Sequence, residues 1–238
     1  MRKIIFAWGL SMLLAVSAWS QTVNENLVNL EKYQEELPFF QELITGAQYP
    51  EPPRNYDGFP FLETRSFENG GLTINRIFYP EVPLLYDIRF DQVITFHPIF
   101  SQKLLINPAK VDGFVLANGN EFKKLKGNED YLYDKNGFYE IIADGPFALV
   151  SKHYKVDKPA RELGEYVGYY LEYEDFFLVK DDQFFPIRNK KDAIKRLQIE
   201  KKAIRENLTK KGIYFNQNRR KYLIALLELA PNFPSDSL

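Results

Sequence analysis

Hydrophobic and polar residues alternate through the middle of the chain, in short runs separated by turn residues. In Leu72-Thr73-Ile74-Asn75, for example, apolar and polar side chains take turns, as in a strand that buries one face. Further runs rich in aromatic and β-branched residues cover 82–88, 92–96, 103–106, 113–116, 131–133, 138–142, 147–150, 166–171, 176–179 and 184–187. The pattern predicts an antiparallel β domain over residues 70–187.

Turn dipeptides stand between several of these runs. Asn118-Gly119, Asn136-Gly137 and Asp144-Gly145 each separate two apolar runs, and Asp181-Asp182 precedes the last one. Asn, Asp and Gly tolerate the positive φ angles of tight hairpin turns, so these pairs predict hairpins between neighbouring runs. Successive hairpins make a meander, and we expect it to form a curved sheet, a sandwich or a half-barrel.

A helical period appears only near the end of the chain. The apolar positions of the first helix fall on one stripe, namely Ala193, Ile194, Leu197, Ile204 and Leu208. Asn189 is expected to cap this helix and Gly212 to end it. A second helix is expected over about residues 217–229, with Tyr222, Leu223, Leu226 and Leu227 facing inward. The expected fold class is α+β, mainly β, with two C-terminal helices.

The first 69 residues follow a different plan. Met1-Arg2-Lys3 is cationic, Ile4 to Val16 is apolar, and small residues precede a cleavage point after Ser20 or after Ala18. This is the pattern of a secretory signal peptide, and the apolar run is shorter than the about 20 residues that a spanning helix needs. Residues 21–69 are expected to hold a short helix at 24–34 and a proline-rich connector. The expected domains are residues 1–20, 21–69, 70–187 and 188–238.

The absence of cysteine bears on where the exported protein is expected and on how it could be attached. The chain has no cysteine, so it has neither a lipobox nor a disulfide. We expect an exported protein of a Gram-negative bacterium, periplasmic or extracellular, that is not a lipoprotein and does not span the membrane.

The formal net charge of −1 hides a division along the chain. Residues 21–187 hold 16 Lys and Arg against 27 Asp and Glu, whereas residues 188–222 hold 13 against 3. The basic segment either complements the acidic body or contacts an anionic surface. The second reading assigns the contact to Lys190, Lys191, Lys195, Arg196, Lys201, Lys202 and Arg205. The expected partner is an envelope component, either protein, lipid or lipopolysaccharide; nucleic acid is not expected in an exported protein.

Candidate chemistry is sparse. The two histidines, His97 and His153, lie near Ser101 and Ser151, and the pair Ser151 and His153 would share one strand face as exposed polar residues. Without cysteine, a zinc site has few ligands, and no glycine-rich loop for a nucleotide cofactor is present. The acidic group at Glu172, Glu174 and Asp175 is expected to be a solvated strand edge. We predict no catalytic residue, metal or cofactor.

Aromatic residues crowd the segment from Tyr166 to Phe177. Most are expected in the core, where such rings bury large areas. Alternation places Tyr169, Leu171 and Tyr173 on one face and Tyr170 with Glu172 on the other. Tyr170 is therefore expected to be the exposed ring.

Several short stretches resemble a family of uncharacterised exported proteins of Gram-negative bacteria. They are Phe78-Tyr79, Val82 to Asp87, Asp91 to Ile94, Lys110 to Phe114, Gly137 to Glu140 and the basic helix. The resemblance implies export and a β-rich fold, and it carries no reaction and no functional residue. The main functional hypothesis is an exported, non-enzymatic binding or envelope-accessory protein. The alternatives are an exported hydrolase of glycans or peptides, and a structural β domain that mediates protein contacts.

Overall fold

The computed structural model describes residue 43 and residues 46–97, 99–161 and 164–230. The chain divides into two compact units, Met1–Thr45 and Gly46–Leu238. The predicted signal peptide and the predicted helix at 24–34 lie outside the described residues. The strands and helices that the structure describes by name all belong to the second unit.

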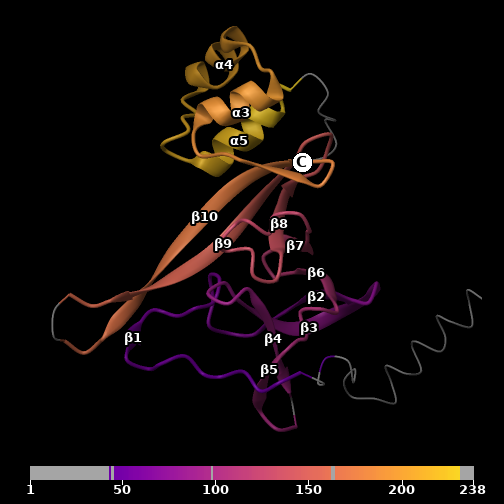
Figure 1. Cartoon of the computed structure of the whole chain (residues 1–238), viewed down its shortest axis with the longest axis vertical. Helices are drawn as coiled ribbons and strands as arrows, with labels where there is room; N and C mark the ends of the chain where they lie inside the picture. Colours follow the sequence, from indigo (N-terminus) through magenta and orange to yellow (C-terminus); the bar gives the residue numbers. More distant parts are fainter. Residues whose placement is uncertain (1–42, 44–45, 98, 162–163, 231–238) are drawn as a thin grey trace, which may run out of the picture. The chain divides into compact units, whose positions relative to one another are not determined.

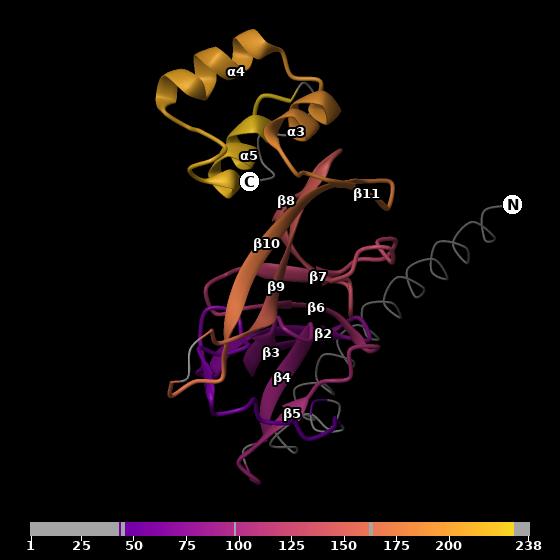
Figure 2. The ribbon, with the colours of Figure 1, turned by 60° about the vertical axis from the view of Figure 1, so that its left-hand side comes forward.

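Eleven strands form one open sheet, shown in Figures 1 and 2. The strands are β1 (Tyr56–Asp57), β2 (Glu68–Ile74), β3 (Ile77–Asp87), β4 (Gln92–His97), β5 (Gln102–Leu105), β6 (Val111–Val115), β7 (Glu121–Lys124), β8 (Phe138–Ala143), β9 (Ala148–Pro159), β10 (Gly168–Lys180) and β11 (Gln183–Pro186). Their order is β1-β10-β9-β8-β7-β6-β2-β3-β4-β5, and β11 also pairs with β10. All pairs are antiparallel except β1 with β10. The predicted antiparallel, mainly β fold is confirmed, as an open sheet.

The turn chemistry produces the predicted hairpins at three places. Gly119 joins β6 to β7 with φ 89°, and Gly145 joins β8 to β9 with φ 156°. Asp181 and Asp182 join β10 to β11 with φ of 50° and 59°, the signs that a type I′ turn requires. The predicted run 166–171, from Gly168 on, and the run 176–179 belong to one long strand, β10, because β9 and β10 stay in register over twelve residue pairs.

The segment before Asn136-Gly137 differs from the prediction. Residues 131–133 form no strand, and a loop connects β7 to β8. Its tyrosines pack onto the sheet: the Tyr131 hydroxyl donates to Asp175 at 2.6 Å, and the rings of Tyr133 and Tyr154 stack with centroids 3.6 Å apart. Side-chain packing, which local alternation cannot reveal, accounts for the two tyrosines, whereas Leu132 between them is exposed.

The helices that follow the sheet are α3 (Lys190–Leu197), α4 (Lys201–Asn207) and α5 (Arg219–Leu227), with a 3-10 turn η1 (Thr209–Lys211). Asn189 caps α3 as predicted, in a capping box with Asp192. The expected long first helix is broken after Leu197, because Gln198 is left-handed with φ 56°. The Ile199 amide then donates to the Ile194 carbonyl at 3.2 Å, the bond of a Schellman ending.

A shared core joins the helices to the sheet. It is formed by Ala143, Leu149, Phe176, Leu178 and Ile187 from the β region with Ala193, Leu197, Ile199, Leu208, Phe215, Tyr222, Leu223, Leu226 and Leu227 from the helical region. The inward residues of α5 are the four predicted ones. Because both regions supply this core, residues 188–230, hereafter the C-terminal helical segment, are held against β8 to β11.

Candidate functional site

Two predicted polar residues lie together inside the sheet. Ser151 and His153 share one face of β9, as the alternation predicts, with Ser151 Oγ and His153 Nε2 3.2 Å apart. Both are buried, with exposed fractions of 0% and 9%, so the expectation that they are exposed polar residues is wrong. Both side chains instead contact the buried Glu140 carboxylate, which Arg220 of the C-terminal helical segment also binds.

Glu140 on β8 and Arg220 on α5 complete the cluster. Glu140 Oε2 lies 2.7 Å from His153 Nε2, and both Arg220 terminal nitrogens donate to the Glu140 carboxylate. Arg220 Nη1 also donates to Glu174 Oε1 on β10 at 3.2 Å. Burial raises the pKa of Glu140, but the hydrogen bonds and charges of Arg220 and His153 outweigh it and lower the pKa to about 2.

This cluster is unsuited to acyl transfer. In a Ser-His-acid triad the imidazole uses one nitrogen for the serine and the other for the acid. Here Ser151 Oγ and Glu140 Oε2 both meet Nε2 of His153. Ser151 is also fully buried, out of reach of a substrate. A carboxyl group with a pKa near 2 cannot serve as a general acid near neutral pH.

The same residues include the ligand types of a metal site. Donor atoms of Glu140, His153 and Glu174 lie within 4.8 Å of one another. The Arg220 guanidinium, however, already contacts both carboxylates and supplies the positive charge between them. The arrangement is therefore a closed ion-pair network that ties α5 to three strands.

Sequence reasoning missed Glu140 and Arg220. They are 80 positions apart, and only the packing of α5 on the sheet brings them together. Glu174 was expected at a solvated edge, yet it is only partly exposed, because β9 pairs along its strand and Arg220 contacts its carboxylate. His97, the other candidate, is buried, and its Nδ1 accepts the Phe100 amide at 3.4 Å.

The predicted cationic residues are on the surface. All seven are exposed, and none forms an ion pair with another described residue. They are Lys190, Lys191, Lys195 and Arg196 on α3, and Lys201, Lys202 and Arg205 on α4. Within the part of the chain that the structure describes, the acidic body therefore does not neutralise them through direct pairing.

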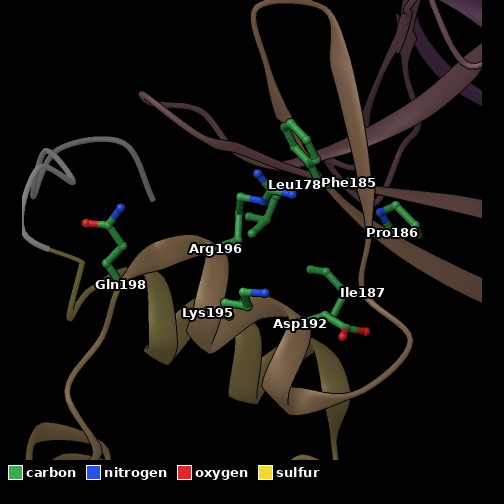
Figure 3. A pocket seen from close by; sticks show the side chains of 8 residues that line it. All are labelled: Leu178, Phe185, Pro186, Ile187, Asp192, Lys195, Arg196 and Gln198. Carbon is green, nitrogen blue, oxygen red and sulfur yellow. The ribbon is translucent and has the colours of Figure 1, made fainter.

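Two of these cations border a groove between α3 and the β10–β11 hairpin (Figure 3). The groove has a volume of about 500 Å³ and is lined by Leu178, Phe185, Pro186, Ile187, Asp192, Lys195, Arg196 and Gln198. The Arg196 guanidinium lies over the Phe185 ring, 3.7 Å from its centroid. In this groove, apolar side chains of the hairpin therefore lie beside the positive charges of Lys195 and Arg196.

Tyr170 differs from its prediction. Its ring is half-buried and packs against Tyr56, with centroids 5.4 Å apart, and its hydroxyl oxygen is buried. The parallel strand β1 beside β10, which alternation cannot reveal, brings Tyr56 next to it. The exposed ring on this strand is Tyr173, at 41%.

Comparisons with known proteins give no family. No protein-family model matches the chain, and no curated protein and no solved structure is detectably similar to it. The resemblance to exported proteins therefore stays a prediction. Within the described ranges, none of the helices has the length and apolar character to cross a membrane.

Proposed function

We propose that this chain is a non-enzymatic binding protein whose C-terminal helical segment contacts an anionic component of a bacterial envelope. One observation carries the proposal: seven exposed cations lie on α3 and α4 without a carboxylate partner among the described residues. Exposed Lys and Arg near a membrane surface attract anionic lipid headgroups, each by about 1 kcal/mol.

The polar cluster supports a binding role over a hydrolytic one. Its serine is buried, its histidine has the wrong contacts for a triad, and its glutamate is bound by Arg220. The remaining chemistry of the C-terminal helical segment is positive charge beside apolar side chains, which suits recognition of an anionic, partly apolar surface.

The proposed location outside the cytoplasm rests on two features of the sequence. Residues 1–20 have the pattern of a signal peptide, and no cysteine is available for acylation. We place the protein in the periplasm or outside the cell, attached non-covalently.

Vesicle co-sedimentation tests the proposal. The purified chain is mixed with phosphatidylglycerol vesicles or with phosphatidylcholine vesicles, at low and at high salt. We expect binding to the anionic vesicles at low salt and its loss at high salt, because salt screens contacts between exposed charges. Binding to both lipids alike, or to neither at low salt, would contradict the proposal.

A charge-reversal pair locates the contact. Changing Lys190, Lys191, Lys201 and Lys202 to Glu leaves the groove residues intact and should weaken vesicle binding by roughly two orders of magnitude or more, at about 1 kcal/mol per charge. The control reverses four exposed cations elsewhere, namely Arg54, Lys126, Lys158 and Arg161, with the same change in net charge. Equal loss in both variants would mean that only net charge matters and would remove the helical contact.

A further inference from the structure

We propose that the groove between α3 and β11 binds an anionic lipid, with an acyl chain on its apolar wall and the phosphate group at Lys195 and Arg196. This inference rests on the proposed function, because it gives the helical surface a specific ligand.

The apolar wall comes from the hairpin. Pro186 is exposed and Phe185 is half-buried, so these two residues give the wall its accessible surface, whereas Leu178 and Ile187 line it as buried core residues. Figure 3 shows these side chains on the hairpin side of the groove, facing the α3 cations. At about 500 Å³, the groove falls in the range of small-molecule sites, about 300–1,000 Å³. It offers hydrocarbon contact beside the charged surface.

Arg196 is held in place for an anion. The guanidinium carbon of Arg196 lies over the Phe185 ring, and a cation–π contact of this kind uses none of the N–H groups of the arginine. An oriented guanidinium can donate two parallel hydrogen bonds to phosphate oxygens. Lys195, the preceding residue, adds a second exposed positive charge.

The one acid in the groove is already engaged. Asp192 Oδ2 accepts the backbone amides of Arg188 and Asn189, at 3.0 and 3.1 Å, and the Asn189 side-chain amide at 3.0 Å. This carboxylate serves the helix cap. With two cations, Lys195 and Arg196, against this one carboxylate, the groove keeps an excess of positive charge.

A neighbouring groove provides the contrast. It has a similar volume, about 480 Å³, and shares Pro186 and Ile187. Its two arginines, Arg188 and Arg219, are matched by Asp130 and Asp175. Equal numbers of opposite charges give an anion no net attraction, so the anionic ligand is assigned to the α3–β11 groove.

Calorimetric titration of the full chain tests the inference with three probes. They are monododecyl phosphate below its micelle concentration, dodecyl maltoside as a neutral amphiphile, and inorganic phosphate. We expect saturable binding of monododecyl phosphate at one site. The other two probes should bind at least about tenfold more weakly, because dodecyl maltoside lacks the phosphate group and inorganic phosphate lacks the alkyl chain. Equal binding of inorganic phosphate or of the neutral amphiphile would overturn the lipid assignment.

A matched pair of variants locates the site. Lys195→Gln with Arg196→Gln should weaken monododecyl phosphate binding about tenfold or more. Lys210→Gln with Lys211→Gln removes the same charge from exposed positions outside both the groove and the seven assigned cations, and should leave this binding within about twofold. Equal weakening of monododecyl phosphate binding in both variants would overturn the groove assignment. The vesicle experiment tests the proposed function separately, so that proposal would not be decided by this result.

An acidic peptide tests for a protein partner. If it binds at Lys195 and Arg196 more tightly than monododecyl phosphate, the groove is assigned to a protein partner and the lipid inference is overturned.

Discussion

At the residue scale, Glu140 makes the stability of the fold depend on acid. Its folded-state pKa of about 2 lies below its ordinary value of 4.5. A depressed carboxyl pKa contributes stability that is complete above pH 4.5 and is lost as pH falls toward 2, here about 3 kcal/mol. Urea unfolding gives the free energy of unfolding of the native chain and of Glu140→Gln at pH 7 and at pH 2.5. The difference between the two proteins at pH 7, minus their difference at pH 2.5, measures this contribution.

Two variants check the direction of this pH dependence and the role of Arg220 in it. The advantage of the native chain over Glu140→Gln should shrink on acidification, because only the native chain must protonate a bound carboxylate. In Arg220→Leu the pH-dependent part should be smaller, because the guanidinium that lowers the pKa is gone. An unchanged difference from pH 7 to pH 2.5 would contradict the ion-pair network.

The buried pair Lys152 and Asp91 supports a second prediction. Lys152 Nζ lies 2.6 Å from Asp91 Oδ2, and their side chains are 1% and 2% exposed. Lys152→Met leaves the carboxylate buried without its cation and should cost about 3–5 kcal/mol. Adding Asp91→Asn removes that charge, and Asn tolerates the left-handed backbone of position 91. Urea melts should find the double variant more stable than Lys152→Met; additive losses would mean that the charges are not coupled.

These polar residues mark the limit of sequence reasoning. Alternation correctly placed Ser151 and His153 on one strand face, because the side chains of a strand repeat every second residue. It could not place Glu140, Glu174 or Arg220 beside them, because three strands and a helix must first assemble. The exposure predicted for His153 failed for the same reason.

At the element scale, the break between α3 and α4 gives the next prediction. Gln198 carries a side chain at φ 56°, a position where helices commonly end on glycine. Gln198→Gly should raise the free energy of unfolding by roughly 0.5–1 kcal/mol by removing the strain of a left-handed side chain. The control, Lys195→Gly inside α3, should lower it by about 1 kcal/mol. Chemical unfolding measures both, and a loss in Gln198→Gly would contradict the left-handed ending.

The elements that could be predicted from the sequence are those marked by a short local pattern, such as a helical period or a turn dipeptide. Helix α5 and its inward residues follow from a 3.6-residue period, and the β10–β11 turn follows from Asp181-Asp182. The break at Gln198 lacks a glycine, and the apolar stripe continues across it to Ile204. Its physical cause is Ile199, which lies off the stripe and is buried in the shared core. Tertiary burial overrides the helical period at that point.

At the scale of the whole molecule, the shared core predicts that the sheet and the C-terminal helical segment unfold together. Leu226 on α5 is fully buried in the core that also contains Leu149, Phe176 and Leu178. Leu226→Ala should cost about 2–5 kcal/mol, because it leaves a cavity between α5 and the strands. Hydrogen exchange should register that loss in the amides of β9 and β10 as well as in α5, since elements of one cooperative unit open together. Leu223→Ala, at a neighbouring buried position, should likewise speed hydrogen exchange in both the strands and α5. Faster exchange in the helices alone would show that the C-terminal helical segment opens as a separate unit.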